Sequence, residues 1–464
     1  MGKCLTFLLL FIIGGKNLFS QQNSTLFFMP GTPQANFVNP AVTNDCRLII
    51  GLPVLSSVHL NAGNSAFSYN QLSTKERIGN VSYFDSEFHT NLLFAGFWVK
   101  KNFLTFSVNE KADLFMTYPG DLFAIIQKGN SQFEGETAKL GRSGTFLNYR
   151  REYAVGIARQ TKSKLWWGAR GKLLFGKLNT TMTKSKVDLF TDPVTFDLTF
   201  TSDWQLNSSL PMNVTRNAQG YVESVEYNDA SVGSILMNRQ NIGFSTDLGF
   251  IKKVDDLITV SGSILDLGII SWKTNGTSFA QNGTYTYKGP IGDSIDSENY
   301  MENLTRIIQE EFGITATQKS YIQPLSPRIY LGATYKLRDD LTAGVLGTAK
   351  INRYKITKGL TLSLNKQFSE KFTGSVSYSY LYRDLRNLGL GVKIGKNPLQ
   401  FYAVSDNVLG FFNLAATHTA NLRFGLHLNF GCDRESGFGG CGCAGMQNSS
   451  NHRQKMNKLL KKKK

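Results

Sequence analysis

Apolar and polar residues alternate in short runs along most of this sequence, and this period of two constrains the fold more than any other feature. In the run 328–337, one side consists of Ile329, Leu331, Ala333, Tyr335 and Leu337, and the other of Arg328, Tyr330, Gly332, Thr334 and Lys336. Alternate side chains of a β-strand point to opposite faces of a sheet. Runs of about 9–11 residues with one apolar face are typical of strands that cross a bilayer. Such strands must close into a ring, because lipid offers no partner to an unpaired backbone N–H or C=O.

The same pattern recurs elsewhere, with turn residues such as Arg338-Asp339-Asp340 and Ser369-Glu370-Lys371 between successive runs. The clearest runs are 328–337, 341–351, 372–382, 388–394, 421–430, 104–109, 153–158, 167–176 and 242–250. Weaker runs lie at 46–67, 88–99, 184–201, 204–216, 258–272, 356–367 and 398–405. Together they predict an all-β fold, a transmembrane antiparallel up-and-down β-barrel of about 14 strands, with roughly two either way.

Helical patterns interrupt the strands twice. The segments 121–128 and 294–312 are predicted to be short helices in loops, as caps, plugs or docking surfaces. A soluble antiparallel sandwich would also alternate, so periodicity alone does not decide for a membrane barrel. A final strand that ends on Phe430 and a candidate signal peptide favour the membrane barrel. A final strand of this kind is the type of segment that barrel-insertion machinery recognises.

The first residues are typical of a cleaved signal peptide. Lys3 precedes an apolar run from Cys4 to Ile13, which is too short to span a bilayer of about 30 Å as a helix. We expect cleavage near Ser20 and export to the cell outer membrane as a multi-pass barrel. No linker divides the remaining chain, so four parts are predicted: the signal peptide 1–20, an N-terminal periplasmic or plug segment 21–45, the barrel 46–431, and a Cys/Gly- and Lys-rich periplasmic tail 432–464.

The formal net charge of +17 is partly a property of the tail, where eight Lys and Arg accompany two acids after Gly431. No nucleic-acid recognition motif accompanies this charge, so we expect outer-membrane lipid and lipopolysaccharide as partners and no nucleic acid. Three cysteines, Cys432, Cys441 and Cys443, lie close together, whereas Cys46 stands alone. Their spacing matches no zinc pattern, and an oxidising compartment favours a disulfide among the three, with the pairing left open. A flexible tail with incidental cysteines is the alternative.

Three blocks of the sequence resemble a Bacteroidota outer-membrane barrel family of unknown function, distantly similar to PorP/SprF and FadL-like barrels. The blocks are 29–41 with Asn39-Pro40-Ala41, 265–272 and 405–413, followed by the strand that begins Asn421-Leu422-Arg423. The cysteine-containing tail departs from barrels that stop at their terminal Phe. The resemblance implies a barrel without known catalysis: FadL-like relatives transport hydrophobic compounds past an N-terminal plug, and PorP/SprF-like relatives work with the type IX secretion and gliding machinery.

Motifs of catalytic and metal sites are missing from the sequence. Its five histidines have no zinc-helix spacing, and no nucleophile elbow or phosphate loop is present. We therefore expect no enzyme, no cofactor and no metal site. The basic residues in the inward phase are the best candidates for a functional set, either in a charge-balanced lumen or in an electropositive pore that favours anions: Arg170, Lys172, Arg328, Lys336, Lys350, Lys393 and Arg423. The predicted function is a porin- or FadL-like passive or gated transporter of small molecules, and the alternative is a PorP/SprF-like assembly or anchoring barrel for secreted surface proteins.

Overall fold

The computed structural model describes residues 23–29, 31–65, 81–228, 231–288, 313–381, 384–395, 397–413 and 417–432. The predicted signal peptide 1–20, the predicted loop helix 294–312 and the tail from residue 433 lie outside these residues. The helix predicted at 121–128 is present as α4 (Gly120–Lys128). None of the described helices is both long enough and apolar enough to cross a membrane.

The sheet closes into a ring because the last strand pairs with the first. β22 (Thr419–Phe430) runs antiparallel to β1 (Leu48–Gly51) and β2 (Val54–Asn64), which together make one wall position. The result is a closed antiparallel β-barrel of 14 strands, as the alternation predicts. In order around the ring the wall consists of β1 with β2, β3 (Val81–Val99), β4 (Asn102–Pro119), β6 (Gly144–Gln160), β7 (Leu165–Thr191), β11 (Asn241–Lys253), β12 (Ile258–Trp272), β16 (Arg328–Arg338), β17 (Leu341–Ile351), β18 (Ile356–Gln367), β19 (Phe372–Leu381), β20 (Asp384–Gly395), β21 (Leu399–Ser405) and β22.

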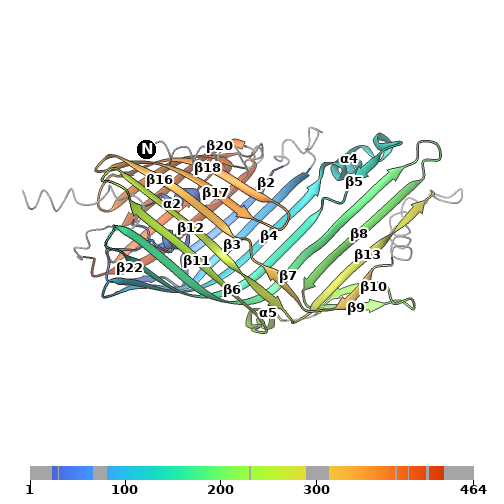
Figure 1. Cartoon of the computed structure of the whole chain (residues 1–464), viewed down its shortest axis with the longest axis horizontal. Coiled ribbons are helices and arrows are strands. Elements are labelled where there is room, and N and C mark those ends of the chain that lie inside the picture. Colours follow the sequence, from blue (N-terminus) through green and yellow to red (C-terminus); the bar gives the residue numbers. More distant parts are fainter. Residues whose placement is uncertain are drawn as a thin grey trace, which may run out of the picture.

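Part of the sheet extends well past the ring at one end (Figure 1). β7 is 27 residues long, and its far half pairs with β8 (Leu198–Ser209), which in turn pairs with β13 (Gly276–Tyr287). The prediction of separate wall strands at 184–201 and 204–216 is therefore wrong. Residues 184–191 are the far end of β7, and β8 belongs to the extension rather than to the ring. The physical reason is that a hairpin beyond the ring can alternate as a wall strand does, so periodicity does not mark where the ring ends.

The two ends of the barrel differ in their connections. At one end, tight turns such as Lys100-Lys101 and Asp339-Asp340 join neighbouring strands, and Phe430 pairs there with Leu48. We call this the tight-turn end, and the other the long-loop end. The long-loop end and the extension carry the remaining described elements: β5 (Thr137–Lys139), β9 (Met212–Arg216), β10 (Val222–Tyr227), β14 (Thr315–Gln318), β15 (Tyr321–Pro324), η2 (Ser131–Phe133), α5 (Val232–Met237) and α7 (Leu409–Phe412). Short turns at one end and long loops at the other are typical of outer-membrane barrels.

The two faces of the wall differ in chemistry. Between β18 and β19, Leu362 opposes Tyr378 on the outer face, and the two side chains are 55% and 49% exposed. One step along the same strands, Ser363 opposes Ser377 on the inner face, and both are buried. The wall therefore presents apolar side chains outward and small polar side chains to the lumen, as a sheet surrounded by lipid requires.

Candidate functional site

The N-terminal segment lies inside the ring and is called the plug here (residues 23–44). It contains α2 (Ser24–Phe27) and the short 3-10 helix η1 (Pro33–Phe37), and most of its side chains are buried. Its contacts reach the inner face of the wall on all sides of the ring. Apolar plug residues pack against apolar residues of the inner wall in one buried cluster: Leu26, Phe28, Met29 and Val38 of the plug, with Leu265, Tyr330, Leu346, Tyr402 and Val404 of the wall.

The start of the plug is held by one carboxylate. The backbone N–H groups of Asn23 and Thr25 donate to Asp406 at 2.6 and 2.8 Å, and that of Ser24 donates at 3.3 Å. Asp406 follows the end of β21 and is fully buried, so it has little water to satisfy it. Asn23 is also fixed through its side chain, which accepts a hydrogen bond from Arg423 Nε at 2.7 Å. Asp406 thus acts as a clamp on the first turn of the plug.

The second half of the plug is seated against β7, β11 and β12. Arg170 donates to the backbone oxygen of Asn36 at 2.7 Å and also to its side chain, and Ser263 Oγ donates to the backbone oxygen of Val38 at 2.6 Å. Asn39 Nδ2 donates to the backbone oxygen of Phe250 at 3.2 Å. These are hydrogen bonds between a buried segment and the wall, and each one lies within the interior of the barrel.

Two wall glycines form the seat of Asn39-Pro40. Gly168 and Gly249 face each other across β7 and β11. A Cβ at Gly168 would lie 2.2 Å from the backbone oxygen of Pro40, and one at Gly249 would lie 2.1 Å from Asn39 Oδ1. Close approach of another backbone is a use that only glycine permits without strain. The wall therefore has glycine at the two positions where the Asn-Pro-Ala motif comes closest to it.

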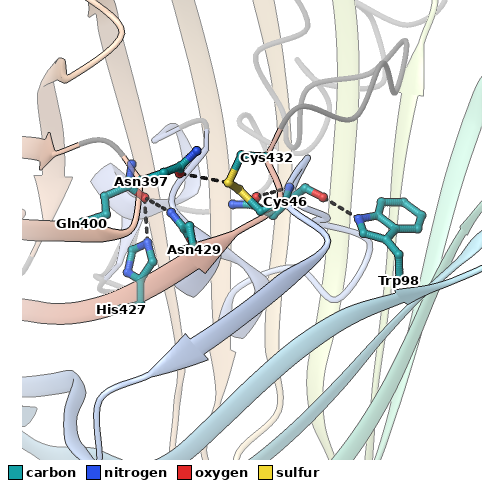
Figure 2. The surroundings of a disulfide bond; sticks show 8 residues. Cys46, Trp98, Asn397, Gln400, His427, Asn429 and Cys432 are labelled. Atoms are coloured by element: carbon teal, nitrogen blue, oxygen red, sulfur yellow. Dashed lines mark hydrogen bonds between the residues drawn. A yellow bond between two sulfur atoms is a disulfide. The ribbon is translucent and has the colours of Figure 1, made fainter.

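A disulfide ties the end of the plug region to the end of the last strand (Figure 2). Cys46 pairs with Cys432, 386 residues away along the chain. Beside it, Trp98 Nε1 donates to the backbone oxygen of Asn44 at 2.7 Å. Closure of the ring brings Cys46 to Cys432, so a disulfide among the three cysteines of the tail cannot include Cys432. Cys441 and Cys443 lie outside the described residues, and a bond between those two stays a prediction.

Peptide mapping tests this pairing. We expect digestion of the unreduced protein to release one peptide pair that joins Cys46 to Cys432, and reduction to separate it. Alkylation of free thiols before digestion is the control, because it prevents exchange during handling. A linkage confined to the three cysteines of the tail would contradict the pairing.

Ion pairs cross the lumen between opposite walls. β3 and β17 are seven positions apart in the ring of 14, so they face each other across its width. Lys350 of β17 nevertheless contacts Glu87 Oε1 at 2.6 Å and Asp85 Oδ1 at 3.0 Å, both on β3. From β16, Arg328 contacts Glu87 Oε1 at 2.9 Å and Asp113 of β4 at 3.4 Å. The barrel is narrow enough at this level for side chains to bridge it.

A second set of buried ion pairs continues this layer along the wall. Lys172 of β7 contacts Asp247 of β11 and Asp266 of β12, each at 2.6 Å. Lys111 Nζ lies 3.0 Å from Glu152 and 3.7 Å from Asp266. Because these carboxylates and cations alternate, this layer is close to charge balance, and each charge in these two sets has an opposite charge beside it.

An aromatic layer covers the ion pairs on the long-loop side. Tyr83, Phe115 and Phe146 form a buried cluster on β3, β4 and β6. Tyr354, from the turn between β17 and β18, packs against this cluster, and its hydroxyl donates to the backbone oxygens of Thr145 and Met182 at 3.0 and 2.5 Å. A turn of one wall therefore reaches the opposite wall. Plug, ion pairs and aromatic layer close the lumen in succession.

Little free space remains between the plug and the ion pairs. A cavity of about 50 Å³ lies there, bordered by residues of both, including Val38, His89, Lys111 and Arg328. This volume holds a water molecule or two rather than a solute. At this level, the described plug and ion-pair residues therefore fill most of the lumen.

Five of the seven predicted lumen-facing basic residues are buried inside the ring: Arg170, Lys172, Arg328, Lys350 and Arg423. The first four have carboxylate partners, which favours the charge-balanced alternative over an electropositive pore; ion selectivity itself stays a prediction. Lys393 is half-buried, with Nζ 3.0 Å from where a Cβ of Gly31 would stand, so it borders the plug. Lys336 lies outside the cluster, near the tight-turn end, and pairs with Asp339 at 2.7 Å.

The acids of the interior, and His59 and His89 beside them, were missed from the sequence. Asp85, Glu87 and His89 alternate with Phe84, Ser86 and Phe88, which is the pattern of an inward-facing row. This signal was available, but the expected strand began only at residue 88. Among the described residues, His59, Glu87 and His89 also place one ligand atom each within 4.8 Å of one another, in a group able to hold a metal ion.

A family model, described as a family of unknown function (DUF5723), matches residues 40–406. The chain belongs to this family. The match extends from Pro40, which contacts the wall glycines, to Asp406, so it includes the ion pairs across the lumen but not residues 23–39 of the plug. Among curated proteins, no sequence matches the chain.

Several solved structures are similar to this member of the family over most of its length. The toluene transporter TodX of Pseudomonas putida is 10% identical, with 89% of this chain and 93% of TodX covered and a TM-score of 0.37. A FadL homologue of Pseudomonas aeruginosa is 10% identical, with 88% of this chain and 95% of the homologue covered and a TM-score of 0.39. The toluene transporter TbuX of Ralstonia pickettii is 10% identical, with 86% of this chain and 94% of TbuX covered and a TM-score of 0.40. Likeness at this level carries no argument about what this chain moves or binds.

Proposed function

We propose that this chain is an outer-membrane barrel that acts as a gated passive transporter of small hydrophilic solutes and is closed at rest. The observation that carries the proposal is the combination of a polar inner wall with a lumen sealed by hydrogen-bonded groups. Such a seal can open by exchanging its hydrogen bonds for hydrogen bonds to water, at a small net cost for each bond. A lumen packed throughout by apolar side chains would have no such route.

The outer face supports a location in the membrane. Apolar side chains on neighbouring strands form a belt, with Val345 beside Leu362 and Leu362 beside Tyr378. A contiguous exposed belt of this kind would be a liability on a soluble protein. Closure of the ring leaves no unpaired sheet edge, as lipid requires.

Arginine at the middle of this belt should destabilise the folded barrel. Leu362 lies midway along β18 and is 55% exposed, so Leu362→Arg places a charge at the expected membrane midplane at a cost of about 2–4 kcal/mol. Leu337→Arg is the matched control, because Leu337 lies next to the last residue of β16, where the cost falls to about 0–1 kcal/mol. Urea unfolding from lipid vesicles measures both. Equal effects of the two substitutions would contradict a membrane belt at this height.

The lining of the lumen supports a hydrophilic solute. On β18 and β19 the inward side chains are Thr361, Ser363, Asn365, Ser375, Ser377 and Ser379, all buried in the closed state. Hydroxyl and amide groups both donate and accept hydrogen bonds, so they suit neutral or zwitterionic solutes better than hydrocarbons. Charge balance in the ion-pair layer also disfavours strong selection for one sign of charge.

A reversible lock on the plug tests the proposal. Thr25 Oγ1 of the plug and Ser377 Oγ of β19 are 2.6 Å apart, so cysteines at both positions should form a disulfide. In proteoliposomes that carry Thr25→Cys with Ser377→Cys, we expect oxidation to abolish the uptake of arabinose and glycine and reduction to restore it. Wild type under both conditions controls for the native Cys46–Cys432 bond, and each single variant controls for the substitutions.

Uptake that is the same with the lock closed and open would contradict a gate formed by the plug. No observation on the described residues favours the alternative role as an assembly or anchoring barrel, and that role stays a prediction.

A further inference from the structure

We propose that His59, Glu87 and His89 form a binding site for a divalent transition-metal ion of the zinc type, set into the inner wall where the ion pairs cross the lumen. The proposal does not depend on transport, because it follows from the donor atoms alone. Two imidazoles and one carboxylate, with a further position open, are a donor set that zinc takes in proteins.

The register of two strands creates the site. His59 of β2 lies directly opposite His89 of β3, and Glu87 precedes His89 by two residues on the same face. Directly opposed side chains in an antiparallel pair have their Cβ atoms about 4.5–5.5 Å apart, so two imidazoles at such a pair can reach a common point. The ring centroids of the two histidines are 5.5 Å apart.

The donor atoms are almost at coordination spacing. Glu87 Oε2 lies 3.7 Å from His59 Nε2 and 3.8 Å from His89 Nε2. Ligand bonds of about 2.0–2.1 Å in a tetrahedron separate neighbouring donor atoms by about 3.3–3.4 Å. Both Glu87–histidine distances exceed this spacing by about 0.4 Å, and all three donor atoms lie within 4.8 Å of one another, so rotation of the side chains would have to draw the two imidazoles together to bring them onto one ion.

Two of the three residues have donor atoms with nothing else to bind. Both ring nitrogens of His59 and Glu87 Oε2 have no hydrogen-bond partner among the described residues, and the two side chains are only 2% and 3% exposed. A buried polar atom without a partner costs about 1–3 kcal/mol, and native proteins seldom leave one so. Here two such atoms, His59 Nε2 and Glu87 Oε2, belong to the same cluster and lie 3.7 Å apart.

The surroundings orient the ligands. Arg328 and Lys350 both contact Glu87 Oε1, at 2.9 and 2.6 Å, and this leaves Oε2 turned toward the histidines. His89 Nε2 is hydrogen-bonded to Asp113 at 2.8 Å, and metal binding would replace that bond. Asp113 would still have its ion pair with Arg150, at 2.5 Å. The carboxylates of Asp85 and Asp113 offset the two cations near the ion. Second-shell contacts of this kind raise metal affinity by fixing ligand geometry.

Space exists for a further ligand. His89 also borders the cavity of about 50 Å³ between the plug and the ion pairs. That volume accommodates water, which completes the coordination of zinc where a protein supplies three ligands. A bound ion would link β2 and β3 directly and the opposite wall through Glu87.

Metal titration of the full chain tests the site. The protein is purified in detergent without a histidine tag, stripped with EDTA and titrated with Zn²⁺ by calorimetry, and with Co²⁺ to follow its visible absorption. We expect one ion per chain. His59→Gln should weaken binding by more than about tenfold, since the loss of even a second-shell group costs that much. His418→Gln is the matched control, because His418 bonds to the backbone of Asn64 outside the cluster and should leave binding unchanged.

Folding is checked separately by heat-modifiable gel mobility. The side chain of His59 makes no hydrogen bond in the described structure, so His59→Gln should fold as wild type does. Zn²⁺ should also raise the unfolding temperature of wild type and His418→Gln, but not of His59→Gln, because a ligand that binds only the folded state stabilises it. Folded wild type that shows no saturable binding would overturn the proposal, as would a His59→Gln variant that binds Zn²⁺ like wild type.

Discussion

Replacing Asp406 with alanine should release the plug from the barrel wall. The carboxylate accepts three backbone N–H groups, from Asn23, Ser24 and Thr25, and each hydrogen bond to a charged acceptor contributes about 1.5–3 kcal/mol. Alanine removes every one of these acceptors and leaves the three N–H groups buried without a partner. We expect the N-terminal segment of Asp406→Ala to become sensitive to protease in detergent, and its proteoliposomes to leak arabinose faster than those of wild type by at least tenfold.

Asp406→Asn is the matched control for this prediction. Asparagine has the same shape and keeps one acceptor oxygen, so it should retain part of the clamp and give intermediate protease sensitivity. Heat-modifiable mobility confirms that each variant is folded. If Asp406→Ala resists protease and leakage as wild type does, Asp406 does not hold the plug.

Replacing Lys350 with methionine should destabilise the barrel by about 3–5 kcal/mol, which is the cost of leaving a buried charge without its partner. Lys350 is 4% exposed and contacts both Asp85 and Glu87. Methionine would remove this cation from the two buried carboxylates, and Arg328 would be the cation that still contacts Glu87 among the described residues. Urea unfolding from vesicles gives the free energy. The cross-lumen position of the pair makes this one of the largest single-residue effects that we expect.

Lys336→Met is the control for Lys350→Met. Lys336 pairs with Asp339 in a tight turn at the surface, and exposed pairs contribute little, so no measurable change is expected. In a double-mutant cycle, Lys350→Met with Glu87→Gln should cost less than the two single changes added together, because each removes the other's unpaired partner. Additive effects would show that the two side chains do not interact across the lumen.

The ring could be predicted from the sequence because its information is local. Whether Leu362 faces lipid and Ser363 the lumen follows from a period of two, which needs no knowledge of distant residues. The same reasoning placed Arg328 and Lys350 inside the barrel. Where the ring stops could not be predicted in this way: β7 continues as one strand to Thr191, although it has left the ring.

The closure of the lumen depends on contacts between residues that are far apart along the chain, so it could not be predicted from the sequence. Lys350 meets Asp85 across 265 residues because the barrel is narrow, and no local pattern encodes its width. Cys46 meets Cys432 because β22 pairs with β1, which a cysteine count does not reveal. The contact between His59 and His89 could be predicted only from the register of β2 on β3. A shift of one residue in that register would turn His59 outward.

The most direct test of a lumen closed by its own N-terminal segment is single-channel recording in planar bilayers. Wild type should show only rare, brief conductance steps as the plug opens, whereas a variant that lacks residues 23–40 and keeps the heat-modifiable mobility of a folded barrel should show stable, discrete steps. Stable conductance of wild type equal to that of the shortened chain would contradict the account, and so would a folded shortened chain that remains closed.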